Sequence, residues 1–267
     1  MAKISAENRE LFNSKIAPYK ESVKASLEKE KAMLNLIQKD SSGVGYKKLL
    51  LCEEQIYVAT IWITINNLSV ELLDTKNNDA LNDARKALYK AIIYLEDIVT
   101  SFIDVQYSEI EDKVAEISNT PLEKRFYLVR KLGLAIKLLI DAFGENTKWK
   151  WSFVELQGRF TTVAKNLLDM KQACKDYFDP RSPDYDNTVM YVRLLLRLLD
   201  QSSIQYRDRY ELSTHRIDDM RSAIHYLLAL RRLQILINMK DEAEDVKKKA
   251  QVWKEKMEAD HKKGIAS

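Results

Sequence analysis

The sequence is poor in the residue types from which most catalytic and metal sites are built. It has only two cysteines and three histidines among 267 residues. Cys52 and Cys174 stand alone, without a CxxC pair, so they fit neither a disulfide framework nor a zinc site, and we interpret both as inert thiols. No glycine-rich loop has the spacing of a nucleotide-binding motif. The sequence therefore predicts no catalytic residues, no metal and no cofactor.

One spacing is compatible with a metal ion. Glu211, His215 and Asp219 stand four residues apart, so a continuous helix would place them on one face. A second cluster of ligands is missing from the sequence, whereas a structural zinc site needs four ligands. We therefore interpret these three residues as a row of surface ion pairs.

Glycine and proline are also scarce, with six and four residues, whereas 46 % of the chain is hydrophobic. Apolar residues recur every three or four positions, and no stretch alternates convincingly as a strand would. The pattern predicts an all-α fold, a bundle of about seven long, mostly antiparallel helices without a β-sheet. We expect helices at residues 5–39, 45–74, 79–118, 121–143, 147–178, 187–212 and 214–262, the last with a break near Met239.

Local chemistry sets the expected boundaries. Thr120 can cap a helix that has Pro121 in its first position and Glu123 in its third, where the carboxylate reaches back to the cap. Residues 176–187 hold two prolines and four aspartates, which predict a long loop. We therefore expect an N-terminal helical bundle at residues 1–178 and a C-terminal hairpin or subdomain at 187–267, packed together as one unit.

A long hydrophobic run is missing as well. The N-terminus lacks the apolar segment of a secretory signal, and the run VATIWITI at residues 58–65 is much shorter than the ~20 residues of a membrane span. We therefore expect a cytoplasmic protein without a membrane span. The net charge is only +3, from 43 basic and 40 acidic residues, which gives no general electrostatic attraction to nucleic acid.

Lysine is absent from residues 176–239, although it outnumbers arginine in the chain as a whole. This segment holds nine arginines and six tyrosines, on whose rings guanidinium groups can stack. Arginine suits partly buried ion pairs, because its planar fork satisfies a carboxylate at two points. One interpretation is therefore that the arginines support the fold through pairs along a helix, such as Arg197 with Asp200, Arg207 with Glu211, and Arg221 with Asp218.

The other interpretation is a recognition surface. Arg193 and Arg197 lie one helical turn apart without an acid at position 189 or 201, which is unfavourable unless an anion or an acidic partner faces them. Arg207 and Arg209 flank Asp208 and are bracketed by Tyr206 and Tyr210, a clustering of arginine and tyrosine typical of interface hot spots. The predicted partner-binding residues are Arg193, Arg197, Tyr206, Arg207, Arg209, Tyr210, Trp151 and Trp253.

The two tryptophans enter this set for different reasons. Trp149 and Trp151 lie about 200° apart around one helix, so both cannot face the same core, and we expect Trp151 to be the exposed one. Trp253 belongs to the C-terminal helix, which keeps only a narrow apolar seam, close to coiled-coil spacing. That seam predicts either packing on the chain's own bundle or a partner helix, including a homo-oligomer. Its residues are Ala243, Val246, Ala250, Trp253 and Met257.

The leading functional interpretation is a non-enzymatic helical scaffold or adaptor that binds another protein through its arginine- and tyrosine-rich C-terminal half. The alternative is a helical module that binds an anionic ligand, a phosphopeptide, nucleotide or nucleic acid, at the same arginines. Binding that weakens steeply with salt would distinguish the alternative. A helical enzyme or sensor with a pocket between helices is the third interpretation.

Overall fold

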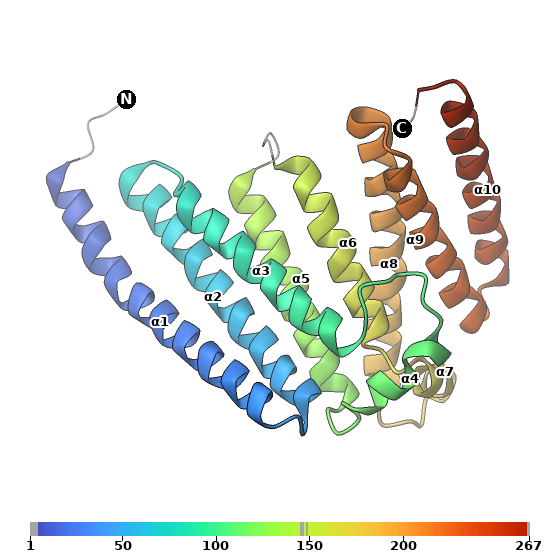
Figure 1. The fold of residues 1–267 in the computed structure, drawn as a ribbon, viewed down its shortest axis with the longest axis horizontal. Coiled ribbons are helices and arrows are strands. Elements are labelled where there is room, and N and C mark those ends of the chain that lie inside the picture. The colour runs from blue at the N-terminus through green and yellow to red at the C-terminus, as the bar shows by residue number, and fades with distance from the viewer. Residues whose placement is uncertain (1–4, 145–146, 148, 266–267) are drawn as a thin grey trace. The chain divides into compact units, whose positions relative to one another are not determined.

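The computed structural model describes residues 5–144, 147 and 149–265. In these residues the chain forms ten α-helices, one short π-helix and no β-strand, which confirms the all-α fold (Figure 1). The α-helices are α1 (Ala6–Lys39), α2 (Val44–Leu73), α3 (Asn78–Ile98), α4 (Tyr107–Ala115), α5 (Leu122–Phe143), α6 (Lys150–Asn166), α7 (Met170–Asp176), α8 (Tyr185–Arg209), α9 (Ile217–Leu236) and α10 (Lys240–Lys262); the π-helix is η1 (Tyr210–Thr214).

The count exceeds the expected seven because predicted helices are interrupted. The helix expected at 79–118 ends at Ile98, and a loop at 99–106 precedes α4. Side chains of α6 hold this loop by its carbonyl groups. Asn166 Nδ2 donates to the carbonyls of Thr100 at 3.3 Å and Phe102 at 3.1 Å, and Lys165 Nζ donates to that of Val105 at 3.2 Å. Carbonyls bonded in this way are satisfied without a helix.

Two further interruptions have local causes. The helix expected at 147–178 is divided into α6 and α7, because the Asp169 side chain accepts the backbone N–H of Gln172 at 3.0 Å and starts a new helix. The break expected near Met239 is confirmed. There Asn238 has a left-handed backbone (φ 64°) that ends α9, and α10 follows directly.

Contacts divide the chain into two compact units. Unit 1 comprises Met1–Ile98 and Tyr127–Lys148, and unit 2 comprises Val99–Phe126 and Trp149–Ser267. Helix α5 therefore gives its first residues to unit 2 and the remainder to unit 1. The expected division into residues 1–178 and 187–267 stays a prediction.

In unit 1, α2 is the central helix and packs on both α1 and α3. It buries apolar side chains on more than one face, as a helix with neighbours on two sides must. Of the helices described, α2 is long and apolar enough to cross a membrane, and 44 % of its most apolar 18-residue window is buried inside the protein. The expected absence of a membrane span stays a prediction.

In unit 2, α8 packs on α6 and α9, and α9 packs on α10. Tyr191 of α8 is fully buried; its hydroxyl donates to the carbonyl of Ala164 at 2.8 Å and its ring stacks on Phe126 at 5.1 Å between centroids. Farther along α8, the ring of Tyr206 lies against Gly158 of α6, where a Cβ atom would approach it to 2.6 Å. The crossing of α6 and α8 therefore requires glycine, and it positions the end of α8.

Candidate functional site

Arg209, the last residue of α8, points into unit 2. Its guanidinium forms a buried ion pair with Asp219 of α9, donates to the carbonyl of Trp151 at 3.3 Å and lies 4.7 Å from the ring centroid of Tyr206. The other oxygen of Asp219 accepts the hydroxyl of Thr214 at 2.5 Å. Arg209 therefore joins α8, α6 and α9, and its charge is compensated inside the protein.

Arg207 is half-buried and also has acidic neighbours in its own chain. It lies 3.4 Å from Asp208 and 3.6 Å from Glu211, the latter as its spacing predicted. Its guanidinium carbon stands 5.5 Å from the ring centroid of Trp253, which is buried in α10. These contacts place Arg207 between α8 and the C-terminal helix.

The two tyrosines of the predicted set are buried. Tyr206 stacks on Tyr226 at 5.5 Å between ring centroids. Tyr210 donates its hydroxyl to Asp260 of α10 at 2.9 Å. Burial, and then the bond to this carboxylate, raise the pKa of Tyr210 to about 12, while the same bond lowers the pKa of Asp260. Both rings therefore pack inside unit 2.

The tryptophans and the C-terminal seam also lie close to the chain itself. Trp151 is half-buried near the start of α6, with Lys150 Nζ 5.0 Å from its ring centroid. Ala243, Ala250 and Trp253 of the seam are buried, and α10 packs on α9. The seam thus already has a helix against it within unit 2.

Arg193 and Arg197 differ from all of these residues, because both side chains are exposed on α8. They make no hydrogen bond or ion pair with any residue that the structure describes. The expected pair of Arg197 with Asp200 is not formed; Asp200 instead accepts Lys249 of α10 at 3.4 Å. Two guanidinium groups one turn apart therefore face solvent without a counter-charge.

The row with metal-compatible spacing is broken by the end of α8. His215 follows η1 with a left-handed backbone (φ 49°), and Asp219 turns inward to Arg209. Over residues 5–144, 147 and 149–265, no group of three His, Cys, Asp or Glu side chains is arranged to hold a metal. Burial raises the pKa of Cys52 and of Cys174, which disfavours the reactive thiolate.

One family model matches the chain from residue 8 to residue 261. The chain belongs to the TP0443 family. No curated protein and no solved structure matches it. The match covers nearly the whole chain, so it extends over residues of both units of this TP0443 family member.

A second group of cations in this TP0443 family member was not found from the sequence. Lys165 of α6 is largely buried, and burial, followed by the charge of Arg232 on α9, lowers its pKa to about 8. Arg232 has a buried guanidinium nitrogen without a hydrogen-bond partner anywhere in the described chain. Asp104, in the loop at 99–106, acts electrostatically on Lys165, and Nδ1 of His225 on α9 lies 3.9 Å from Asp104. Only the fold brings Asp104, Lys165 and the two α9 residues together, because the three segments lie far apart in sequence.

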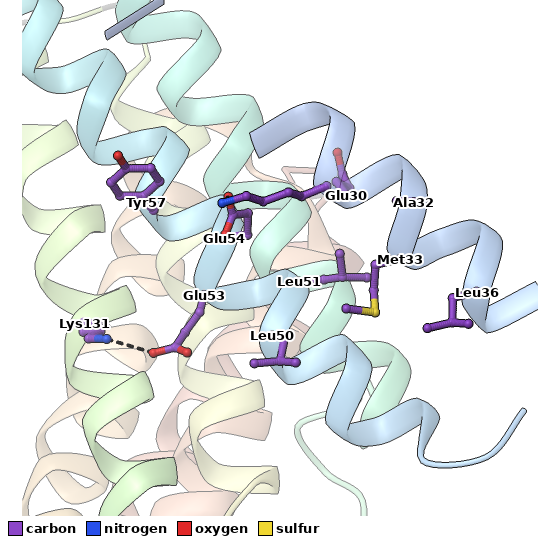
Figure 2. Close-up of a pocket in the computed structure, with 11 residues that line it drawn as sticks. Glu30, Ala32, Met33, Leu36, Leu50, Leu51, Glu53, Glu54, Tyr57 and Lys131 are labelled. Atoms are coloured by element: carbon purple, nitrogen blue, oxygen red, sulfur yellow. Dashed lines mark hydrogen bonds and ion pairs between the residues drawn. The ribbon is translucent and has the colours of Figure 1, made fainter. Parts of the chain in front are cut away.

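Unit 1 holds a pocket of about 670 Å³ between α1 and α2, with Lys131 of α5 on one side (Figure 2). Apolar side chains of both helices, including Met33, Leu36 and Leu50, line one end. Glu53 and Glu54 lie toward the other end, near Tyr57. The sequence gives no indication of this pocket, because its lining residues come from three helices.

Each glutamate that lines the pocket has a lysine near its carboxylate, but the distances between nitrogen and oxygen differ. Glu53 accepts Lys131 Nζ at 2.8 Å, and this bond raises the pKa of Lys131. Glu30 accepts Lys90 at 2.8 Å and the hydroxyl of Tyr94. Among the residues described, Glu54 is paired with Lys29 alone, at the longer distance of 3.7 Å. Glu54 is therefore the least well satisfied carboxylate of the pocket.

Proposed function

We propose that this TP0443 family member is a non-enzymatic helical scaffold or adaptor that binds an acidic surface of another protein through Arg193 and Arg197 of α8. The observation that carries the proposal is that these two exposed arginines lack a counter-charge in the described chain. Arg207 and Arg209, from the same segment, are matched by carboxylates of their own unit. Exposed guanidinium groups at one-turn spacing favour a partner carboxylate.

The other members of the predicted set support this surface indirectly. Tyr206, Tyr210 and Trp253 hold α8 against α6, α9 and α10, so the arginines stand on a rigid helix. A rigid surface loses little conformational entropy on binding. In the same proposal the protein is cytoplasmic, has mostly antiparallel helices and does not span a membrane.

The test is a pull-down from native lysate with the variant Arg193→Glu/Arg197→Glu. The matched control is Arg181→Glu/Arg216→Glu, which makes the same charge change at two other exposed arginines of unit 2. We expect wild type and control to retain a partner that the test variant loses, with circular dichroism establishing that all three are folded. If the test variant recovered every partner as well as wild type does, Arg193 and Arg197 would not be the binding surface and the proposal would be wrong.

A second function is favoured by a separate observation, the buried unpartnered nitrogen of Arg232 beside Lys165. We propose, as the alternative, that unit 2 binds an anionic ligand in the arginine segment, with Arg232 among the binding residues. Such binding weakens steeply as salt rises, because each contact with a phosphate releases a counterion. A ligand that is lost from Arg232→Gln and released by salt, but retained by Arg193→Glu/Arg197→Glu, would favour this alternative over the adaptor.

A further inference from the structure

The pocket of unit 1 is independent of the arginine surface and has the properties of a ligand site. Its volume of about 670 Å³ lies within the range of about 300–1,000 Å³ that is typical of small-molecule sites. Such sites combine apolar walls with a few polar groups that orient the ligand. Here Met33, Leu36 and Leu50 supply the apolar wall, and the carboxylates of α2 supply the polar groups (Figure 2).

The chemistry of the polar end selects the charge of the ligand. Glu54 Oε1 is buried and has no hydrogen-bond partner among the residues described. The nearest cation, Lys29, stands 3.7 Å away on a side chain that is 71 % exposed, so it does not satisfy this oxygen by a hydrogen bond. A carboxylate oxygen in this position requires a donor, and an N–H of a protonated nitrogen is the strongest one.

Tyr57 adds a second preference for a cation. It stands three residues after Glu54 on α2, so the two side chains lie on the same face of the helix (Figure 2). Tyr57 as a whole is 48 % exposed, and it lines the pocket. An ammonium or guanidinium group near Glu54 would therefore also meet an aromatic face.

An anion is disfavoured by the same residues. Glu53 and Glu54 both line the pocket, and Lys131, which α5 contributes to the lining, is already bonded to Glu53 at 2.8 Å. A neutral apolar molecule would fill the apolar end but would leave Glu54 without a donor, which costs affinity relative to a cation.

We propose that this pocket binds a small organic cation, an amine or guanidinium carried by an aliphatic or aromatic group. The cation bonds to Glu54 beside Tyr57, and the hydrocarbon packs against Met33, Leu36 and Leu50. The binding displaces Lys29 from Glu54, which its long contact and its exposure allow. The site would give the protein a ligand-dependent state in unit 1, whatever partner unit 2 binds.

Calorimetric titration of the full chain tests the proposal with three probes of similar shape. These are 2-phenylethylamine, which is cationic, 2-phenylethanol, which is neutral, and phenylacetate, which is anionic. We expect saturable binding of the amine, with affinity at least about tenfold above that of either other probe. Equal affinities, or no saturable binding of the amine up to millimolar concentrations, would overturn the proposal.

Variants locate the bound cation. Glu54→Gln keeps the size of the side chain and removes its charge, and we expect it to weaken amine binding by about tenfold or more. Glu28→Gln makes the same change at an exposed position of α1 outside the pocket and should leave binding unchanged. Tyr57→Leu keeps an apolar wall and should reduce the preference for amine over alcohol. An amine that bound Glu54→Gln as tightly as wild type would place the cation elsewhere and refute the assignment.

Discussion

At the scale of single residues, most buried charges of this protein are matched by another buried or half-buried group. Asp219 meets Arg209 and Thr214, and Glu30 meets Lys90 and Tyr94. Lys165 is one exception, because among the residues described its ammonium donates to neutral oxygens, those of Val105 and the Asn166 side chain. A buried ammonium without a bonded carboxylate favours the neutral form, and this sets how the protein responds to alkaline pH.

Lys165 predicts a stability that rises with pH. Its pKa is lowered to about 8 in the folded protein by burial and by Arg232, against about 10.4 in an unfolded chain. Between these values the unfolded chain binds the proton and the folded protein does not, so the free energy of unfolding rises with pH. Below about pH 8 both states are protonated and the full cost of burying the charge remains. The slope approaches about 1 kcal/mol per pH unit.

Urea denaturation between about pH 8 and pH 10 measures this slope. We expect Lys165→Met to remove the contribution, so the curve of unfolding free energy against pH becomes flatter. Lys175→Met, at an exposed position of unit 2, controls for the loss of a lysine. A slope that Lys165→Met left unchanged would show that other groups control the alkaline response.

The sequence could predict ion pairs along a helix but not those between helices. Arg207 with Glu211 and Arg221 with Asp218 follow from their spacing, and both form, at 3.6 and 2.7 Å. The pair of Arg209 with Asp219 joins two helices across η1, so its spacing along the chain gave no indication of it. Spacing along the chain also gave no indication that two cations, Arg232 and Lys165, come close, because they are 67 residues apart in sequence.

At the scale of helices, the boundaries that depend on local chemistry were predictable. Helix α5 begins directly after Pro121, and α1 ends at Lys39, both within one residue of expectation. The break at residues 99–106 has no glycine or proline to mark it. Its cause is the pair of α6 donors, Asn166 and Lys165, which lie about 60 residues farther along the chain. Periodicity cannot show a break that depends on tertiary contacts.

The junction of α8 and α9 predicts a large difference between two neighbouring arginines. Arg209→Met would leave Asp219, which is 3 % exposed, as an uncompensated buried charge, and we expect a loss of about 3–5 kcal/mol of unfolding free energy. Arg207→Met removes a pair that is partly in solvent, and we expect a loss of about 1 kcal/mol or less.

Denaturant unfolding of both variants checks this difference, and a double-mutant cycle with Asp219→Leu isolates the pair. We expect Arg209→Met/Asp219→Leu to be less destabilised than the sum of the single variants, because removing both partners leaves no buried charge. Additive losses would mean that the two side chains act independently.

At the scale of the whole molecule, unit 2 is built from two separate segments of the chain, Val99–Phe126 and Trp149–Ser267. Sequence composition indicated a boundary at residues 176–187 instead, where prolines and aspartates gather. Within that loop Asp176 accepts the hydroxyl of Ser182 at 2.7 Å, so the turn is held by its own side chains. A loop rich in turn residues can therefore connect two helices of one compact unit.

The folding of a C-terminal fragment tests which division is correct. Residues 185–267 alone would lack Phe126 and α6, against which Tyr191 is fully buried. We expect the full chain to unfold cooperatively on heating and this fragment not to, because the main apolar face of the fragment is exposed. Cooperative unfolding of the fragment, followed by near-ultraviolet circular dichroism, would establish residues 187–267 as a domain of its own.

The π-helical turn at Tyr210–Thr214 has a consequence for how the sequence can change by insertion or deletion. Its wider turn accommodates one residue more than an α-helix would over the same rise. Deleting one residue there would restore α-helical geometry and rotate everything that follows by about 100° relative to α8. The hydrogen bond of Tyr210 to Asp260 and that of Thr214 to Asp219 could then no longer form at the same time. The length of this turn is thus fixed by contacts on both sides of it, whereas its side-chain identities are constrained only where they make those contacts.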